Sequence, residues 1–221
     1  IIKDLMAHRK QSYKEEIANA ITHGIGILFG LTATVFLLIK GIKSGDPWVI
    51  SGFMVYAFGM TLSYVTSTLY HSSRNETAKL YLRKWDHSAI FIHIAGTYTP
   101  FTLILLRQVG WWGWSLFTVV WLIALIGILY TFRKMKDKSP LKTIAYIAMG
   151  SVIVVAIKPM IQIFEGQHMM EILYWLIGGG ACYVVGAVFY SFDKVKYIHT
   201  VWHLFVLGGS VSHCIAIYKL V

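Results

Sequence analysis

Two histidines four residues apart, His199 and His203, lie at the start of the last apolar stretch of the chain. On a helix this spacing places them one turn apart on the same face, about 6 Å apart along the axis. Two imidazoles at that separation can bind one metal ion between them, as half of a zinc site does. The alternative is a pair that hydrogen-bonds lipid headgroups or neighbouring helices. Because ionisable residues inside membrane segments are rare and mostly functional, the remaining ligands must be sought elsewhere in the chain.

The composition is that of an integral membrane protein. Hydrophobic residues make up 57% of the 221 residues and charged residues only 14%, which is too apolar for an ordinary soluble domain. The net charge of +10 does not indicate nucleic-acid binding, because the basic residues fall in short segments between apolar runs and the sequence carries no DNA- or RNA-binding motif. Cys182 and Cys214 lie in apolar runs, so we expect neither a disulfide framework nor a cysteine-based zinc site.

Seven apolar runs follow a basic first segment, and each is near the 20 residues that a helix needs to cross the hydrocarbon core. We predict an all-α membrane protein, a seven-transmembrane helix bundle in one domain over residues 1–221. The predicted spans are at about 17–39, 48–71, 88–106, 111–132, 141–164, 170–191 and 197–218. The breaks between them are short, so consecutive helices should be antiparallel neighbours. Pro159 should kink the fifth helix.

The basic residues are distributed unevenly between the two sides of this bundle. Lys and Arg gather in the first segment and in the second, fourth and sixth breaks, whereas the other breaks hold few. By the positive-inside rule, we predict that the amino terminus is cytoplasmic and the carboxyl terminus is outside.

This topology brings polar residues from three helices to one membrane depth. The second span ends in Ser67-Thr68-Leu69-Tyr70-His71, the third begins near Asp86, and the seventh begins with His199 and His203. Ser67 and His71 are again four residues apart and share a helix face. Three neutral imidazoles would leave a fourth tetrahedral position open for water, the arrangement of catalytic rather than structural zinc.

Each of these residues also has an ordinary structural explanation. Asp86 could cap the amino terminus of the third helix. His71 could be an interfacial residue near a helix end, and Ser67 could hydrogen-bond the carbonyl oxygen four residues earlier. Their coincidence at one depth favours the metal site.

Four short patterns occur in order along the chain. They are Glu16-x-x-Asn19-x-x-x-His23, Ser67-x-x-x-His71, Asp86 followed by Gly96-Thr97-Tyr98-Thr99-Pro100, and His199-x-x-x-His203. In these patterns the chain resembles, over essentially its whole length, the progestin and adipoQ receptor (PAQR) family, and specifically its bacterial hemolysin III branch. The wider superfamily includes alkaline ceramidases with the same Ser, His, Asp and His-x-x-x-His pattern.

The resemblance implies a seven-helix bundle in the bacterial plasma membrane, with its amino terminus inside and a zinc ion near the inner leaflet. By position, it implies that His71, His199 and His203 are the zinc ligands. It also implies that Asp86 holds a zinc-bound water and that Ser67 lies beside that water. The similarity to ceramidases implies hydrolysis of a lipid amide.

Zinc-dependent hydrolysis is chemically consistent with these residues. A zinc-bound water has a pKa of about 7, and the metal can polarise a carbonyl oxygen. In soluble zinc proteases a Glu beside the first His accepts the proton, but Thr200 occupies that place here. Asp86 is therefore the candidate base, with Ser67 orienting the water or donating to the oxyanion. Asp86 could instead bind the metal directly as a fourth ligand, which would close the site and make the zinc structural.

Other polar residues of the spans can be assigned relative to this site. Glu16, Asn19 and His23 share one face of the first helix and could support the metal ligands, although His23 could instead bond only a neighbouring helix. His93 lies deeper in the third helix, where it could hydrogen-bond another helix or line a substrate cavity. His213 lies on a different face from His203 and nearer the outside, so it is excluded from the metal site.

Three classes of function fit this sequence to different degrees. The leading hypothesis is a zinc-dependent hydrolase of lipid amide or ester bonds, linked to membrane lipid homeostasis and reached from the bilayer. The second is a lipid-sensing receptor or regulator of membrane fluidity in which the zinc is structural. The third, a pore, is disfavoured because no helix carries a continuous polar stripe. The expected partners are membrane lipids and a lipid substrate or ligand, with no nucleic acid.

Overall fold

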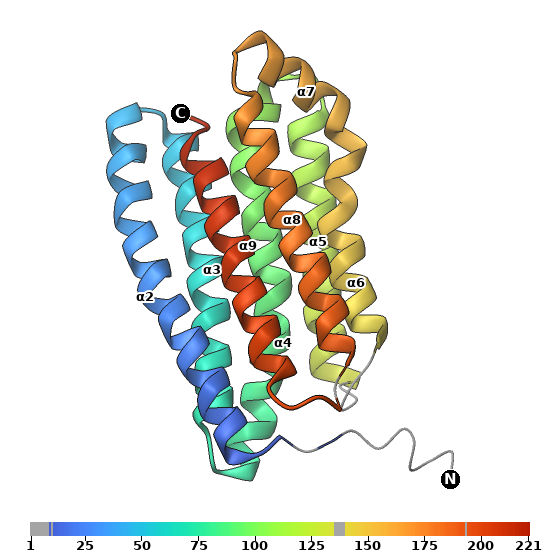
Figure 1. Cartoon of the computed structure of the whole chain (residues 1–221). Coiled ribbons are helices and arrows are strands. Elements are labelled where there is room, and N and C mark those ends of the chain that lie inside the picture. The colour runs from blue at the N-terminus through green and yellow to red at the C-terminus, as the bar shows by residue number, and fades with distance from the viewer. Residues whose placement is uncertain (1–8, 10, 135–139, 193) are drawn as a thin grey trace.

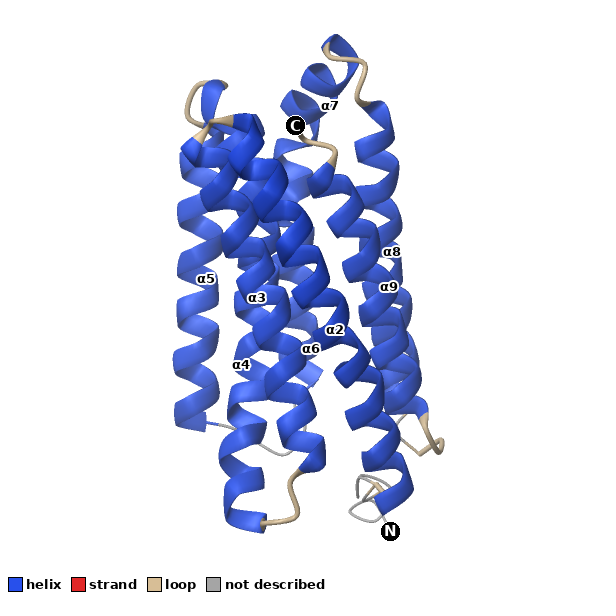
Figure 2. Cartoon of the chain, turned by 90° about the vertical axis from the view of Figure 1, so that its left-hand side faces the viewer, coloured by secondary structure: helices blue, strands red, loops and turns tan. Residues whose placement is uncertain are grey.

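The chain folds into a bundle of helices that stand side by side (Figure 1). The computed structural model describes residues 9, 11–134, 140–192 and 194–221. The helices are α2 (Tyr13–Ser44), α3 (Pro47–Ser72), α4 (Glu76–Pro100), α5 (Trp112–Lys134), α6 (Pro140–Ser151), α7 (Ile157–Gly166), α8 (Met170–Ser191) and α9 (Ile198–Tyr218). A π-helical turn, η1 (Phe101–Leu105), and a 3-10 turn, η2 (Leu106–Gln108), extend α4, and a second 3-10 segment, η3 (Val152–Ala156), joins α6 to α7. The described residues contain no strand (Figure 2).

Seven helical segments in the described part of the chain are long and apolar enough to cross a membrane. Five of these spans are single helices: α2, α3, α5, α8 and α9. The third span along the chain is α4 with its extension, and the fifth span along the chain combines α6, η3 and α7. The start of α2 and the end of α9 lie at opposite ends of the bundle (Figure 1). The prediction of an all-α, seven-span membrane protein is therefore confirmed.

Both ends of α2 and the start of α3 show how the sequence sets the ends of helices. Ser12 precedes α2 and forms a capping box with Glu15, in which each side chain accepts a hydrogen bond from the main-chain N–H of the other. Gly45 ends α2 with φ of +67°, a left-handed conformation that glycine adopts without strain. Asp46 then caps α3 by accepting from the N–H of Trp48, and Pro47 occupies the first helical position.

The third span begins earlier than predicted. The sequence suggests a break over residues 72–85, but α4 starts at Glu76, where the Asn75 side chain accepts from the N–H of Ala78. Asp86 therefore lies ten residues inside the helix, and the suggestion that it caps the helix is wrong. The first three turns were missed because they are polar. The span Glu76–Gln108 has 33 residues, about 50 Å of helix against about 30 Å of hydrocarbon, so its polar start can lie beyond the apolar core of the bilayer.

The fifth span is interrupted, as predicted from Pro159. The 3-10 segment Val152–Ala156 lies directly before α7, in which Pro159 is the third residue. Proline has no N–H to bond the carbonyl oxygen four residues back, and its ring crowds that carbonyl. The regular helical ladder is consequently lost between Ser151 and Ile157.

The third span forms the centre of the bundle, and close glycine contacts fix α3 against it. In its most apolar part 72% of the residues are buried, against 22% in α5, whose apolar side chains face outward. A Cβ added at Gly59 of α3 would lie 2.8 Å from the oxygen of Ile92, and one at Gly96 of α4 would lie 3.0 Å from the oxygen of Val55. The two backbones can approach this closely only because both residues are glycine.

Candidate metal centre

Three histidines from the ends of two helices meet at one end of the bundle. His71 lies in the last turn of α3, and His199 and His203 lie in the first two turns of α9. Each offers one ring nitrogen, and these atoms all lie within 4.8 Å of one another. The ring centroids are 5.0 Å apart for His71 and His199, 5.1 Å for His71 and His203, and 4.6 Å for His199 and His203. The predicted convergence of these rings is confirmed, and the cluster could hold a metal ion.

A carboxylate from the first span fixes the tautomer of His71. The Nδ1 atom of His71 lies 2.7 Å from Oε2 of Glu16, whose other oxygen accepts from Lys79 Nζ at 2.8 Å. Because an ionised carboxylate can only accept, Nδ1 carries a proton, and in the neutral imidazole Nε2 then holds the lone pair. That Nε2 atom is buried and has no hydrogen-bond partner in the described structure. A buried imidazole nitrogen with a free lone pair is the form in which histidine binds metal.

The first span fixes the tautomer of His203 in the same way. Its Nδ1 lies 3.2 Å from the main-chain oxygen of Asn19 and 3.2 Å from Oγ1 of Thr22. The Thr22 hydroxyl is within 3.0 Å of the carbonyl oxygens of Ala18 and Asn19 and donates in that direction. Both neighbours of Nδ1 therefore act as acceptors, which places the proton on Nδ1 and the lone pair on Nε2.

His23 packs directly against one of these three histidines. Its ring stacks on that of His203 with centroids 3.5 Å apart and an interplanar angle of 13°, and its other side meets the edge of Tyr64 at 5.1 Å. Within the described residues neither ring nitrogen of His23 has a hydrogen-bond partner. His23 thus contacts neighbouring helices through its ring faces and edges rather than through the hydrogen bond considered from the sequence.

The amino-terminal turns of α2 also hold the start of α9. Oδ1 of Asn19 accepts from Oγ1 of Thr200 at 2.6 Å, and Nδ2 donates to Gln11 at 2.7 Å. Glu15, which is 2% exposed, accepts from the N–H of Tyr197 at 2.8 Å and pairs with Arg9. Tyr197 has φ of +60° immediately before α9, so this contact holds a strained residue at the helix start.

Several of these supporting residues were not identified from the sequence. They are Glu15, Thr22, Lys79 and Thr200. The Ser12-x-x-Glu15 pattern is a capping signature that singles out Glu15, but only the crossing of α2 with α9 reveals its contact with Tyr197. Thr22 and Thr200 carry no signal of their own, because threonine in a membrane helix commonly bonds its own backbone.

Asp86 and Ser67 lie at the edge of the histidine cluster. The carboxyl group of Asp86 is near both Ser67 and His71 and interacts with their side chains electrostatically. Among the residues described, however, the group with ligand atoms within 4.8 Å of one another contains the three histidines and not Asp86. Asp86 therefore lies beside the histidine cluster without being a member of it.

The Ser67 hydroxyl is buried beside these groups. Of the residues that the structure describes, none forms a hydrogen bond with Ser67 Oγ, so the bond back to the carbonyl oxygen of Ser63 that the sequence allows is not formed. The neighbouring Thr66 does bond back in this manner, at 2.9 Å from the oxygen of Leu62. The Ser67 hydroxyl instead interacts with the carboxyl group of Asp86, across the contact between α3 and α4.

Two further histidines of the helix interiors, His93 and His213, lie away from this cluster. His213 on α9 has Nε2 3.1 Å from the carbonyl oxygen of Leu176 on α8 and lies outside the three-histidine group, in agreement with its exclusion from the metal site. The His93 ring lies next to those of Tyr64 and Tyr183, with centroids 6.3 Å from each. His93 Nε2 forms no hydrogen bond with any described residue.

The fold and this cluster define a class of protein: a seven-span membrane bundle with three histidines gathered at one end. The chain belongs to the haemolysin III family, because the model of that family, described as Haemolysin-III related, matches residues 11–214. Hemolysin-3 of Bacillus cereus is 42% identical over 217 residues, which cover 97% of this chain and 96% of that protein. The Hemolysin-3 homolog of Bacillus subtilis (strain 168) is 42% identical over 207 residues, covering 93% and 94%.

A more distant relative extends the similarity beyond bacteria. The human monocyte to macrophage differentiation factor is 26% identical over 216 residues, covering 95% of this chain and 86% of that protein. The resemblance to the hemolysin III branch noted from the sequence motifs is thus confirmed. Together with the seven apolar helices, the two Bacillus relatives indicate a multi-pass protein of the bacterial plasma membrane.

Proposed function

We propose that this protein is a zinc-dependent hydrolase of lipid amide or ester bonds that contributes to membrane lipid homeostasis. The observation that carries the proposal is the orientation of His71 and His203. In both residues Nδ1 donates a hydrogen bond to α2, which leaves Nε2 as the nitrogen that can bind a metal ion in a cluster of three imidazoles. A support of this kind is typical of histidines that bind a metal.

The residues present fit zinc, whereas they do not fit magnesium or calcium. His71, His199 and His203 supply three imidazole nitrogens and no thiolate or carboxylate, a set found in catalytic zinc sites. Magnesium and calcium prefer oxygen ligands. Ligand atoms in a tetrahedral zinc site are roughly 3.3 Å apart, so nitrogens within 4.8 Å of one another need only small side-chain movements to bind. When bound, zinc would supply a Lewis acid that acidifies water and polarises a carbonyl group.

Asp86 and Ser67 are placed to perform the acid and base steps. The Asp86 carboxylate, beside His71 and Ser67, would accept the proton from the attacking water and return it to the leaving group. Ser67 Oγ would donate to the substrate carbonyl oxygen as negative charge develops on it. Asp86 is suited to this task because it lies near the ligands without being one of them. Its carboxylate oxygens therefore remain available to accept a proton rather than bind the metal.

The location of the site supports a lipid as the substrate. All three histidines lie in membrane-spanning helices, close to the end of the bundle where α2 begins. The Lys and Arg distribution predicts that this end is cytoplasmic, which would place the reaction at the inner leaflet. An acyl amide or ester lies at the junction of a lipid's headgroup and its chains, the depth that these helix ends would occupy.

A second candidate is a lipid-sensing regulator in which the metal is structural. The observation that favours it is the set of hydrogen bonds that join α2, α3, α4 and α9 around the histidines. Among them, Glu16 accepts from Lys79 and lies in hydrogen-bond contact with His71. A metal bound there would clamp α3 to α9 without any reaction. The two candidates differ in Asp86, which a hydrolase needs and a clamp does not.

A pore within a single chain is not supported, although two relatives carry the name hemolysin. Large side chains with at most 1% exposure fill the interior between the described helices: Phe53, Tyr56, Met60, Tyr64, Phe101. Lipid hydrolysis, by contrast, needs no continuous passage.

The test uses the full chain, purified and reconstituted in phosphatidylcholine nanodiscs, with a panel of lipid amides and esters. Wild type should release fatty acid, and Asp86→Asn should lower the rate by at least about 100-fold while keeping bound zinc. His168→Asn is the matched control, since His168 lies in a connection with φ of +57° that asparagine tolerates. Zinc-loaded wild type that releases no fatty acid from any lipid of the panel would exclude the hydrolase and favour the regulator.

A further inference from the structure

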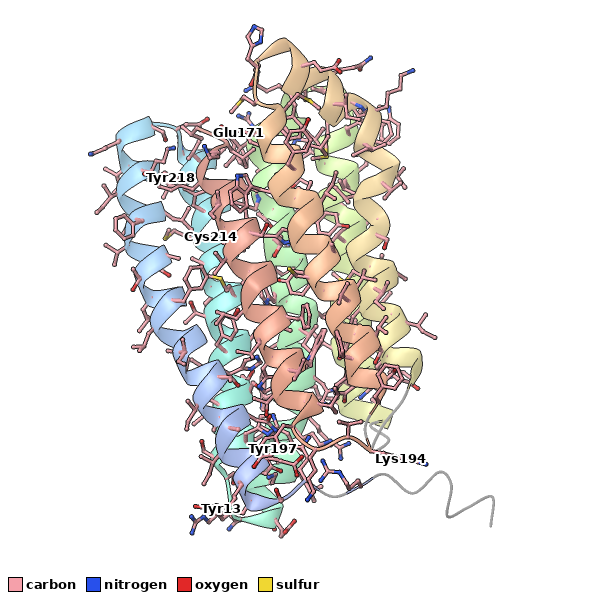
Figure 3. The ribbon with its side chains drawn as sticks, viewed as in Figure 1. Tyr13, Glu171, Lys194, Tyr197, Cys214 and Tyr218 are labelled. Carbon is pink, nitrogen blue, oxygen red and sulfur yellow. The ribbon has the colours of Figure 1, made fainter. Side chains whose placement is uncertain are left out.

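A groove opens between the first and last helices at the end of the bundle opposite the histidines. Helices α2 and α9 lie close together where α2 begins and diverge toward the other end, as both Figure 1 and Figure 2 show. The space between them has a volume of about 540 Å³ and opens to the outside of the bundle. In Figure 3 Cys214 and Tyr218 mark this end, and Tyr13 and Tyr197 mark the other. The groove is therefore separate from the candidate metal centre.

The walls of this groove are apolar over the length of one membrane leaflet. Phe29, Phe36 and Leu37 of α2 and Cys214 and Ile215 of α9 line it. From Phe29 to Lys40 the helix advances eleven residues, about 16 Å at 1.5 Å per residue. Half of a hydrocarbon core about 30 Å thick is about 15 Å, so the groove matches the depth that the acyl chain of one leaflet occupies.

The mouth of the groove is positively charged. Lys40 and Lys219 line it, and Lys43 lines the adjoining hollow. Lys219 is paired with Glu171 at 2.9 Å. Lys40 donates instead to the carbonyl oxygen of Tyr218 at 2.7 Å and lies 4.0 Å from the centre of that residue's ring.

No carboxylate among the described residues pairs with Lys40 or Lys43. A lysine this close to the hydrocarbon is stabilised by an anion at the headgroup level. The groove therefore combines an apolar channel for a chain with a site for a negative charge at its open end.

We propose that the groove between α2 and α9 binds an anionic phospholipid, with one acyl chain lying from Lys40 down to Phe29 and the phosphate at Lys40 and Lys43. This lipid is distinct from any substrate at the histidines, because the two sites lie in opposite halves of the membrane. Bound there, it would fill the space between diverging helices and hold the outer half of α2 against α9.

The experiment is native mass spectrometry of the full chain in detergent with equal amounts of phosphatidylglycerol and phosphatidylcholine that carry the same acyl chains. Wild type should retain phosphatidylglycerol preferentially. Lys40→Gln should weaken that retention roughly fivefold, the effect of one charge near the membrane surface, whereas Lys40→Arg should preserve it. Lys158→Gln is the charge control, because Lys158 is exposed on α7 in the same half of the bundle, away from the groove.

The groove itself is tested by filling it. Thr32 is exposed, lines the groove and bonds only the carbonyl oxygen of Leu28 in its own helix, so Thr32→Trp should abolish the preferred lipid adduct. Thr118→Trp, at an exposed position on α5, should leave it unchanged. Equal retention of the two lipids by wild type, or an unchanged adduct in Thr32→Trp, would overturn the proposal. So would binding of glycerophosphoglycerol without acyl chains, or a dimer that Thr32→Trp dissociates, since the groove would then hold a headgroup alone or a second copy.

Discussion

The Nδ1 atom of His203 lies 3.2 Å from the main-chain oxygen of Asn19, which joins the last membrane helix to the first at the candidate metal centre. Because this oxygen belongs to the backbone of α2, the orientation of His203 depends on where α2 lies rather than on the Asn19 side chain. The Asn19 side chain instead holds Thr200, three residues before His203. The first helix therefore orients histidines of α3 and α9, although it contributes no member of the three-histidine cluster.

The first prediction concerns Glu16, which fixes the tautomer of His71. Glu16→Gln keeps the shape of the side chain but replaces an obligate acceptor by an amide, so Nδ1 of His71 is no longer held as strongly. Zinc affinity, measured by competition with a chromophoric chelator, should fall by about 10- to 100-fold. The exposed Glu171, which pairs only with Lys219 among the described residues, provides the matched control Glu171→Gln. Equal affinity in Glu16→Gln and wild type would show that Glu16 does not support His71.

The second prediction concerns Glu15, which joins α2 to the start of α9. This buried carboxylate accepts from Arg9, Ser12 and the N–H of Tyr197. Glu15→Gln should lower the free energy of unfolding by about 1–3 kcal/mol, because it weakens charged hydrogen bonds at a buried position. Thermal unfolding in detergent measures the change. The exposed Glu165 on α7 is the control, and a loss of equal size in Glu165→Gln would contradict the specific role of Glu15.

The third prediction separates packing from hydrogen bonding at His23. Its ring stacks on His203, while neither of its nitrogens is bonded to a described residue. His23→Phe should therefore retain zinc affinity within a few-fold of wild type. His23→Ala should lower both stability and affinity, because it leaves a cavity beside His203. A comparable loss of affinity in His23→Phe would mean that the imidazole nitrogens of His23 are needed.

The convergence of His71, His199 and His203 could be predicted because it depends on two robust signals. Spacing by four places Ser67 with His71, and His199 with His203, on common helix faces. The four spans between the end of the second and the start of the seventh return the chain to the same side. The position of Asp86 at that depth was also correct. The predicted start of its helix was wrong, because residues 76–85 are polar although they are helical. Hydropathy detects only the apolar part of a helix, which lies in the hydrocarbon.

Contacts that depend on how two helices cross could not be predicted. Glu15 and Thr22 meet Tyr197 and His203 only because α2 runs beside α9, a pair that lies far apart in the sequence. The divergence of these helices, which opens the groove beside Lys40, likewise follows from packing. A lysine at position 40 in the sequence indicates only that a helix is approaching the membrane surface.

The fourth prediction, removal of the metal, tests whether the histidines join α3 to α9 through it. Chelation should lower the thermal unfolding midpoint of wild type, because a ligand that binds only the folded state stabilises it. The same treatment should not change the midpoint of His199→Ala, which has lost a ligand. If chelation lowers the midpoint of both proteins equally, the stabilising ion lies elsewhere.

Metal analysis of the purified full chain tests the central claim most directly. Elemental analysis of wild type after dialysis against trace zinc should give one zinc per chain. His71→Ala and His203→Ala, each of which removes one of three ligands from different helices, should give close to none, while His213→Gln, outside the cluster, should retain one. A wild-type chain without zinc, or an unchanged zinc content in both ligand variants, would contradict the account.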